Sequence, residues 1–113
     1  MTKSEYFKFA HTFFDNCIRI SEKKNADYTG LSDDPFSNFT FVENMGVKTE
    51  QGFITRMGDK LKRIASFTER GELSVQNESV MDSLSDLANY CCLMAGYIKS
   101  IEDRVETKLP WEE

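Results

Sequence analysis

The chain has 113 residues, 40% of them hydrophobic, which suits one domain with its own core better than two. Its net charge of −5 and sequence pI near 4.9 argue against a protein that coats nucleic acid, because neutralising phosphates requires a broad positive surface. No apolar run approaches the ~20 residues that span a bilayer. The N-terminal MTKSEYFKF also lacks the apolar core of a signal peptide. We therefore expect a cytoplasmic protein with neither a membrane nor a nucleic-acid polymer as partner.

The first predicted element is a helix over residues 2–24. Thr2 and Glu5 have the spacing of a capping box. One apolar stripe follows at helical period and comprises Phe7, Ala10, Phe14, Cys17 and Ser21. The segment NADYTGLSDDP, residues 25–35, then interrupts the periodicity and predicts a loop of about ten residues, a length at which loops often carry function.

Two helices are predicted next. A short one has Asp34 as N-cap, Pro35 as its first residue and Gly46 as its end. A long one is expected from Thr49, as N-cap, to residue 70, with Gly71 as its end. Its internal glycine, Gly58, indicates either close packing or neutral drift. Its predicted core stripe comprises Ile54, Met57, Leu61, Ile64 and Ala65.

The last predicted helix has the clearest periodicity. Its apolar seam comprises Val80, Leu84, Leu87, Cys91, Met94, Ile98, Ile101 and Val105. Between residues 90 and 98 the helix is apolar nearly all round, which is typical of a central helix covered by neighbours or by another subunit. The sequence thus predicts a single all-α domain over residues 1–108, a bundle of three long helices and one short one. We expect it to form a homo-oligomer, with a loose tail at 109–113.

Charged residues cluster on two of these helices. Arg56, Asp59, Lys60 and Arg63 fall within about one 100° sector, either as a solvated face with internal ion pairs or as an anion-binding face. A polar stripe on the last helix comprises Glu78, Asp82, Ser85, Asp86 and Asn89. Its carboxylates repel one another and require a cation, which is either Mg²⁺ or the basic face of the preceding helix. Magnesium would indicate a nucleotide hydrolase, and the basic face a nucleotide-binding protein.

Four motifs together resemble a known family. They are D-Y in KNADYTG, D-P-F-x-N-F, R-x-x-D-K-x-x-R, and E-x-x-x-D-x-x-x-D-x-x-N-Y, and the resemblance covers about residues 23 to 98. This combination resembles the nucleotide-modification-associated domain family, short all-α proteins common in phage genomes. The resemblance implies a phosphorylated nucleotide as ligand and, for a phage protein, the host cytoplasm as its location.

The chain also looks distantly like the MazG-type all-α nucleotide pyrophosphatases, which bind Mg²⁺ through acidic pairs on two helices. It departs from that pattern because its first helix has no E-E-x-x-E motif and Glu78 and Asp82 are four residues apart instead of three. Small phage proteins also include sponges that sequester cyclic nucleotide signals of bacterial immunity, a role that needs binding without hydrolysis.

The prediction from sequence is a protein that binds a small phosphorylated nucleotide and requires no cofactor. Arg56, Lys60 and Arg63 are the expected anion contacts, and Asp59 orients them. Further expected ligand contacts are Asp27, Tyr28, Asn38, Asn89 and Tyr90. Glu78, Asp82 and Asp86 are metal ligands only under the alternative, a Mg²⁺-dependent nucleoside triphosphate pyrophosphohydrolase. A second alternative is an oligomeric interaction protein that inhibits a host partner, and no catalytic residue is assigned.

Overall fold

The computed structural model describes residues 1–71 and 79–104, and within these ranges every regular element is a helix. The long helices are α1 (Lys3–Thr29), α3 (Thr49–Arg70) and α4 (Val80–Arg104). Between α1 and α3 lie the one-turn helix α2 (Ser37–Thr40) and a 3-10 helix, η1 (Phe41–Met45). The predicted all-α architecture is thereby confirmed for the described residues. None of the helices found there is long and apolar enough to cross a membrane.

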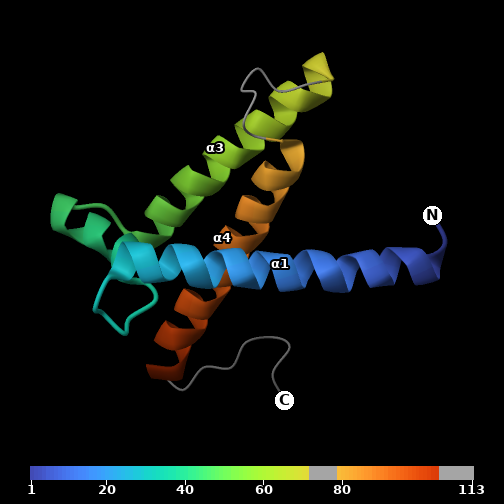
Figure 1. The fold of residues 1–113 in the computed structure, drawn as a ribbon. Helices are drawn as coiled ribbons and strands as arrows, with labels where there is room; N and C mark the ends of the chain where they lie inside the picture. The colour runs from blue at the N-terminus through green and yellow to red at the C-terminus, as the bar shows by residue number, and fades with distance from the viewer. Residues whose placement is uncertain (72–78, 105–113) are drawn as a thin grey trace.

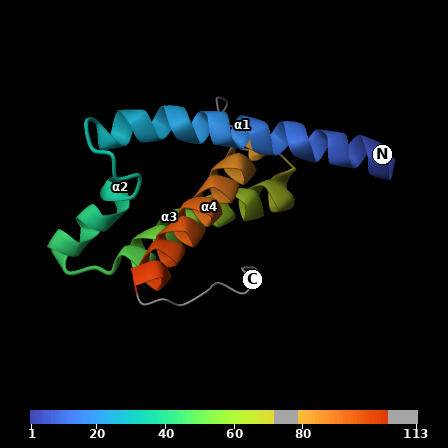
Figure 2. The ribbon, with the colours of Figure 1, turned by 90° about the horizontal axis from the view of Figure 1, so that it is seen from below.

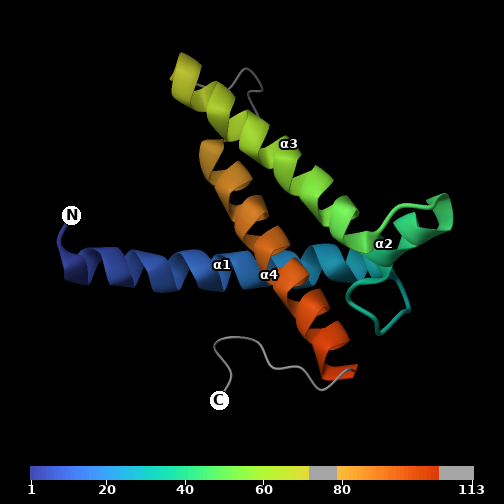
Figure 3. The ribbon, with the colours of Figure 1, turned by 180° about the vertical axis from the view of Figure 1, so that it is seen from behind.

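The long helices form two layers. Helices α3 and α4 pack side by side and antiparallel, and α1 crosses over α4 (Figures 1 and 2). The N-terminal half of α1 extends past α4, as the view from behind also shows (Figure 3). Helix α2 lies near the C-terminal end of α1 and contacts both α1 and α3. Four helices therefore meet around the C-terminal half of α1, whereas its N-terminal half projects away from them.

The core is a small aromatic cluster where α2, α3 and α4 meet. Phe53 is fully buried, and its ring stacks on that of Phe39 with centroids 4.2 Å apart. Tyr90 and Tyr97 of α4 lie against this pair, with centroids 6.2 Å from Phe39 and 6.0 Å from Phe53. Phe36 packs edge-on against Tyr97 at 5.8 Å. These ring contacts fix α2 against the α3–α4 pair.

Helix α1 is longer than the sequence pattern predicts. It continues through residues 25–29, so the prediction of a loop beginning at residue 25 is wrong. Asn and Asp lower helix propensity by only ~0.7 kcal/mol or less relative to Ala, too little to end a helix that has tertiary support. That support includes Asn25, whose Nδ2 donates to the carbonyl oxygen of Pro35 at 2.9 Å. The helix ends at Gly30, which has a φ of 60°.

Several predicted helix ends are confirmed. Thr2 Oγ1 accepts the N–H three residues further along the chain at 3.1 Å. Gly46 and Gly71 follow η1 and α3 in the left-handed conformation, with φ of 77° and 76°. The start of α3 lies one residue from its predicted place, because Lys48 is the N-cap and Thr49 is already helical.

The short helix begins later than predicted. Asp34 Oδ1 accepts the N–H of Phe36 at 2.9 Å and thereby caps a turn over Pro35, and α2 starts only at Ser37. The chain then tightens into the 3-10 geometry of η1 before Gly46 ends it. The predicted residue types are therefore present, but they form a capped turn, one α-helical turn and a 3-10 helix.

The predicted core stripe of α3 is partly wrong. Ile54 and Leu61 are 60% and 55% exposed, whereas Phe53 is 0% exposed and faces the aromatic cluster. Lys60 lies on the same side as Phe53, and only 15% of its side chain is exposed. The helix is thus rotated so that an aromatic ring and a charged side chain point inward. Gly58 has no atom within 4 Å of the place its Cβ would occupy, so of the two interpretations of this glycine close packing is wrong.

Helix α4 begins at a reciprocal cap. The N–H of Ser79 donates to Asp82 Oδ2 at 3.0 Å, and the N–H of Asp82 donates to Ser79 Oγ at 3.1 Å. The predicted apolar seam is only partly covered, because Leu84 and Cys91 are exposed while Ser83 is buried. The predicted end of this seam at position 105 and the predicted tail at 109–113 lie outside the described residues.

Candidate functional site

A polar pocket lies where α1, α2, α3 and α4 meet. It has a volume of about 60 Å³, roughly the share of two waters in the liquid. The side chains that line it come from all four helices and comprise Ser21, Lys24, Asn25, Tyr28, Asn38, Phe39, Arg56, Asp86, Asn89, Tyr90 and Leu93. Cations, amides and phenol groups thus converge on one small depression beside the aromatic core.

Asp86 is the electrostatic centre of this pocket. Its Oδ2 lies 2.9 Å from Lys60 Nζ and its Oδ1 lies 3.2 Å from Lys24 Nζ. Burial alone would raise the pKa of Asp86, but the hydrogen bonds from Lys60 and Lys24 and their charges outweigh it, and the pKa lies below its ordinary value. Asp86 is therefore ionised at neutral pH, with a lysine at each carboxylate oxygen.

The two lysines differ in their freedom to move. The Lys60 side chain is 15% exposed and does not line the pocket, so it holds Asp86 from behind. The Lys24 side chain is 50% exposed and lines the pocket. A lysine on a flexible stem at a half-exposed position can turn to an incoming anion, whereas the inner lysine keeps Asp86 in place.

Arg56 provides a third positive charge. Its guanidinium carbon lies 4.6 Å from the ring centroid of Phe39, which orients the group by a cation–π contact. Within residues 1–71 and 79–104, no carboxylate lies within ion-pair distance of this guanidinium. Its N–H donors are thus available to an acceptor from solution, and arginine presents them as a planar fork that suits phosphate.

The structure brings together many of the residues that the sequence singled out. Those that line the pocket are Tyr28, Asn38, Arg56, Asp86, Asn89 and Tyr90. They come from motifs up to 62 positions apart in sequence, and Lys60 joins them indirectly by its ion pair with Asp86. These seven residues, of which Asp86 was a candidate metal ligand, therefore lie in a single region of the fold.

The remaining predicted site residues lie elsewhere. Asp59 and Arg63 line a separate shallow depression on α3 with Lys62 and Ser66, and share no lining residue with the pocket. Asp27 is exposed on α1 and does not line the pocket. Asp82 caps α4, as described above. Glu78 lies outside the described residues.

Sequence reasoning missed the contribution of α1. Ser21, Lys24 and Asn25 line the pocket together with Tyr28, and they follow the spacing of one helix face. The prediction that a loop begins at residue 25 separated Tyr28 from the helix that holds it. Continuing the helical period through residue 28 would have placed these four polar side chains on one face.

The charge arrangement allows two kinds of contact with a ligand. Lys24 and Arg56 can bind an anion, while Asp86 and the amides of Asn38 and Asn89 can accept or donate hydrogen bonds. Among the residues that the structure describes, no group of three or more Asp, Glu, His or Cys side chains is placed to hold a metal ion. Both oxygens of Asp86, the positions from which it would bind a metal, already face lysines.

Comparisons of the chain with protein-family models, with curated proteins and with solved structures found no match.

Proposed function

We propose that the protein binds a small phosphorylated nucleotide in the polar pocket and retains it without cleaving it. The observation that carries this proposal is the charge of the pocket in an acidic chain. Arg56, Lys24 and Lys60 supply three positive charges against the single negative charge of Asp86, while the whole chain carries −5. A local positive charge of this kind attracts a small anion and not a polymer of phosphates.

The shape of the pocket suggests how the ligand would lie. Its volume of about 60 Å³ suits a phosphoryl-sized group beside Arg56 and Lys24, and not a complete nucleotide. The nucleoside would extend toward Tyr28, which is 64% exposed at the rim and offers a ring face for a base. Stacking of a base on such a ring contributes about 1–3 kcal/mol. Asp86 would then accept hydrogen bonds from ribose hydroxyls or a base edge, and the amide of Asn89 would accept or donate them.

Binding without hydrolysis is favoured because the acidic residues are already engaged in contacts within the chain. A magnesium pyrophosphatase needs several carboxylates free to fix the metal and to position an attacking water. Here Asp86 is paired with two lysines, and Asp82 accepts the N–H of Ser79 at the start of α4. Binding without cleavage would suit the removal of a nucleotide signal in the cytoplasm of a phage-infected cell, and we propose this sponge role for the protein.

Thermal unfolding with a panel of mono-, di-, tri- and cyclic nucleotides in EDTA tests the proposal. A ligand at 100-fold its Kd should raise the free energy of unfolding by about 2.7 kcal/mol, and the nucleotide should be recovered chemically intact after heat denaturation. No stabilisation by any member of the panel would contradict nucleotide binding. Magnesium-dependent release of pyrophosphate would contradict capture and favour the hydrolase.

Matched variants locate the binding site. Arg56→Ala or Lys24→Ala should each remove a charge-assisted hydrogen bond of about 1.5–3 kcal/mol, which weakens binding about 10- to 150-fold. The controls are Lys62→Ala on the outer face of α3 and Lys23→Ala beside Lys24, and both should bind as the wild type does. Equal loss in a control and its partner variant would place the ligand outside the pocket.

A further inference from the structure

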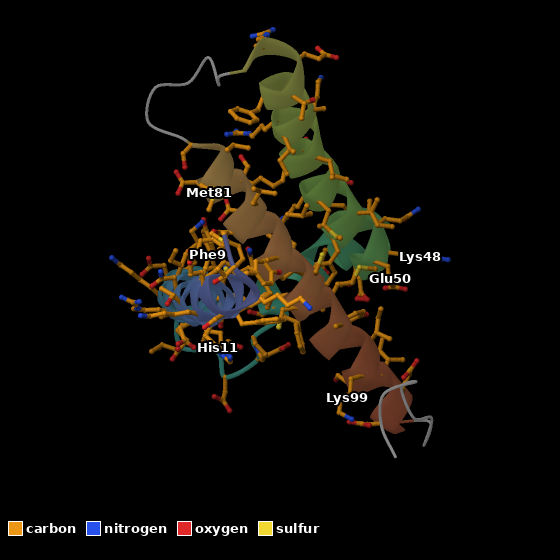
Figure 4. The ribbon with its side chains drawn as sticks, turned by 90° about the vertical axis from the view of Figure 1, so that its right-hand side faces the viewer. Phe9, His11, Lys48, Glu50, Met81 and Lys99 are labelled. Carbon is orange, nitrogen blue, oxygen red and sulfur yellow. The ribbon has the colours of Figure 1, made fainter. Side chains whose placement is uncertain are left out.

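The N-terminal half of α1 carries large apolar side chains that the described part of the chain leaves exposed. Tyr6, Phe7 and Phe14 are 51%, 60% and 57% exposed. This half of the helix projects past α4 (Figure 1), and in the view along α1 Phe9 lies below Met81, which is near the N-terminal end of α4 (Figure 4). Between the diverging helices lies an apolar groove of about 530 Å³. We call it the α1–α4 groove, and Tyr6, Phe9, Phe14, Met81, Leu84 and Cys91 are among the residues that line it.

The exposed area of the chain matches what a dimer interface would bury. A compact folded protein of 13.0 kDa exposes about 6,300 Å², whereas this chain exposes 8674 Å². The excess of about 2,400 Å² lies within the 1,000–2,500 Å² that each subunit of a permanent homodimer typically buries. The radius of gyration, 16.3 Å, likewise exceeds the ~13 Å expected of a compact domain of this length.

The small core indicates that the exposed apolar surface at the α1–α4 groove is covered permanently by a partner. Among the described residues, the apolar side chains that are buried are Cys17, Phe39 and Phe53. Such a core stabilises a 113-residue fold poorly, so a partner met only occasionally would leave the chain marginal for most of its life. A second copy of the same chain is present whenever the protein is, and a two-fold axis lets one apolar surface cover its own equivalent.

We propose that two copies of the chain associate through the α1–α4 groove, with the projecting half of α1 from each copy seated in the groove of the other. The groove shares no lining residue with the polar pocket, so this inference is independent of the proposed ligand. This reciprocal arrangement covers Phe14 and Leu84 of both copies. It also explains why α1 continues as a helix beyond the elements that it contacts in its own chain.

Light scattering after size-exclusion chromatography at micromolar concentration tests this association. The expected mass is about 26 kDa, twice the 13.0 kDa of the chain, or an even multiple of it. The midpoint of urea unfolding should rise with protein concentration, because dissociation accompanies unfolding. A mass of 13.0 kDa together with a midpoint that does not depend on concentration would overturn the proposal.

Charged substitutions locate the interface. Phe14→Glu and Leu84→Glu, one on each side of the groove, should each shift the protein toward the monomer. The control is Leu31→Glu, which puts the same charge at a fully exposed apolar position after α1 and outside the groove and should leave the mass unchanged. If both groove variants keep the wild-type mass, the interface lies elsewhere and the proposal fails. If one variant does not fold, the other variant and the wild-type mass still decide the question.

Discussion

Asp86 links three helices through one carboxylate. Its two oxygens pair with Lys24 of α1 and Lys60 of α3, while the residue itself belongs to α4. Because 17% of the Asp86 side chain and 15% of the Lys60 side chain are exposed, water screens their interaction less than it screens a pair on the surface. The pair therefore contributes to the packing of α3 on α4 as well as to the charge of the pocket.

This pair predicts a specific dependence of stability on pH. The pKa of Asp86 is lower in the folded protein than in the unfolded chain, so the carboxylate stabilises the fold above the unfolded value of about 3.9. This contribution should be lost as the pH falls from about 4 through the lower folded pKa. The Asp86→Asn variant has no such carboxylate to protonate. Its free energy of unfolding, measured with urea, should therefore fall less than that of the wild type as the pH drops below about 4. Identical pH profiles for the wild type and Asp86→Asn would contradict the assignment.

A double-mutant cycle isolates the same interaction. Asp86→Asn should destabilise the protein at pH 7 by about 1–3 kcal/mol, because it leaves the ammonium of Lys60 poorly solvated and without its carboxylate. Lys60→Met should cost a similar amount, and the double variant should cost less than the sum of the two. Additive effects would show that the two side chains do not interact.

The rotation of α3 about its own axis decides which of its side chains face the core and which face the solvent. Its inner face combines the aromatic ring of Phe53 with the long side chains of Arg56 and Lys60, whose apolar stems can pack while their charged ends reach partners. Its outer face carries Ile54 and Leu61. This orientation turns Arg56 toward the pocket and Lys60 toward Asp86.

Two neighbouring substitutions test that orientation. Phe53→Ala should destabilise the protein by about 3–5 kcal/mol, because it empties the centre of the aromatic cluster. Ile54→Ala, one position along the same helix, should change the free energy of unfolding by no more than about 0.5 kcal/mol. Chemical denaturation of both variants measures the difference. A larger loss at Ile54 than at Phe53 would mean that the helix is rotated as its apolar pattern predicts.

The helices could be predicted from the sequence far better than their rotations. Caps and glycines mark where helices begin and end, and the stops at Gly46 and Gly71 were predicted correctly. The inner face of α3 could not be read from periodicity, because both of its faces carry apolar side chains. Burial of Lys60 depends on Asp86, 26 positions later in the chain, and a pattern within one helix cannot contain that information.

The prediction of the site was limited in the same way, because the pattern within one helix does not show how that helix packs. The basic and acidic motifs were singled out from the sequence, but Lys24 was overlooked because its ion pair with Asp86 depends on α1 crossing α4. Asp59 and Arg63 share a sector with Arg56 on a helical projection, yet they line a different depression once the helix is packed. Spacing along one helix identifies a face, and only tertiary packing divides that face between a pocket and the solvent.

At the scale of the whole molecule, the projecting half of α1 predicts a pattern of amide hydrogen exchange. A helical segment of about a dozen residues without tertiary cover is marginal in water and should exchange quickly. If a second copy covers this segment, the amides of residues 7–14 should be protected in the wild type about as well as those of residues 17–25. Phe14→Glu should lose protection in the first range and keep it in the second. Rapid exchange of residues 7–14 in the concentrated wild-type protein would contradict the covered helix.

Phe39 belongs to the core and to the pocket at once. Its ring stacks on Phe53 and lies beneath the guanidinium of Arg56. During evolution this position is therefore under two selective constraints, because a replacement must fill the centre of the cluster and present an aromatic face to a cation. An aliphatic residue of similar volume meets the first requirement and fails the second. Drift at position 39 should thus be confined to aromatic residues, even among descendants that have changed the ligand they bind.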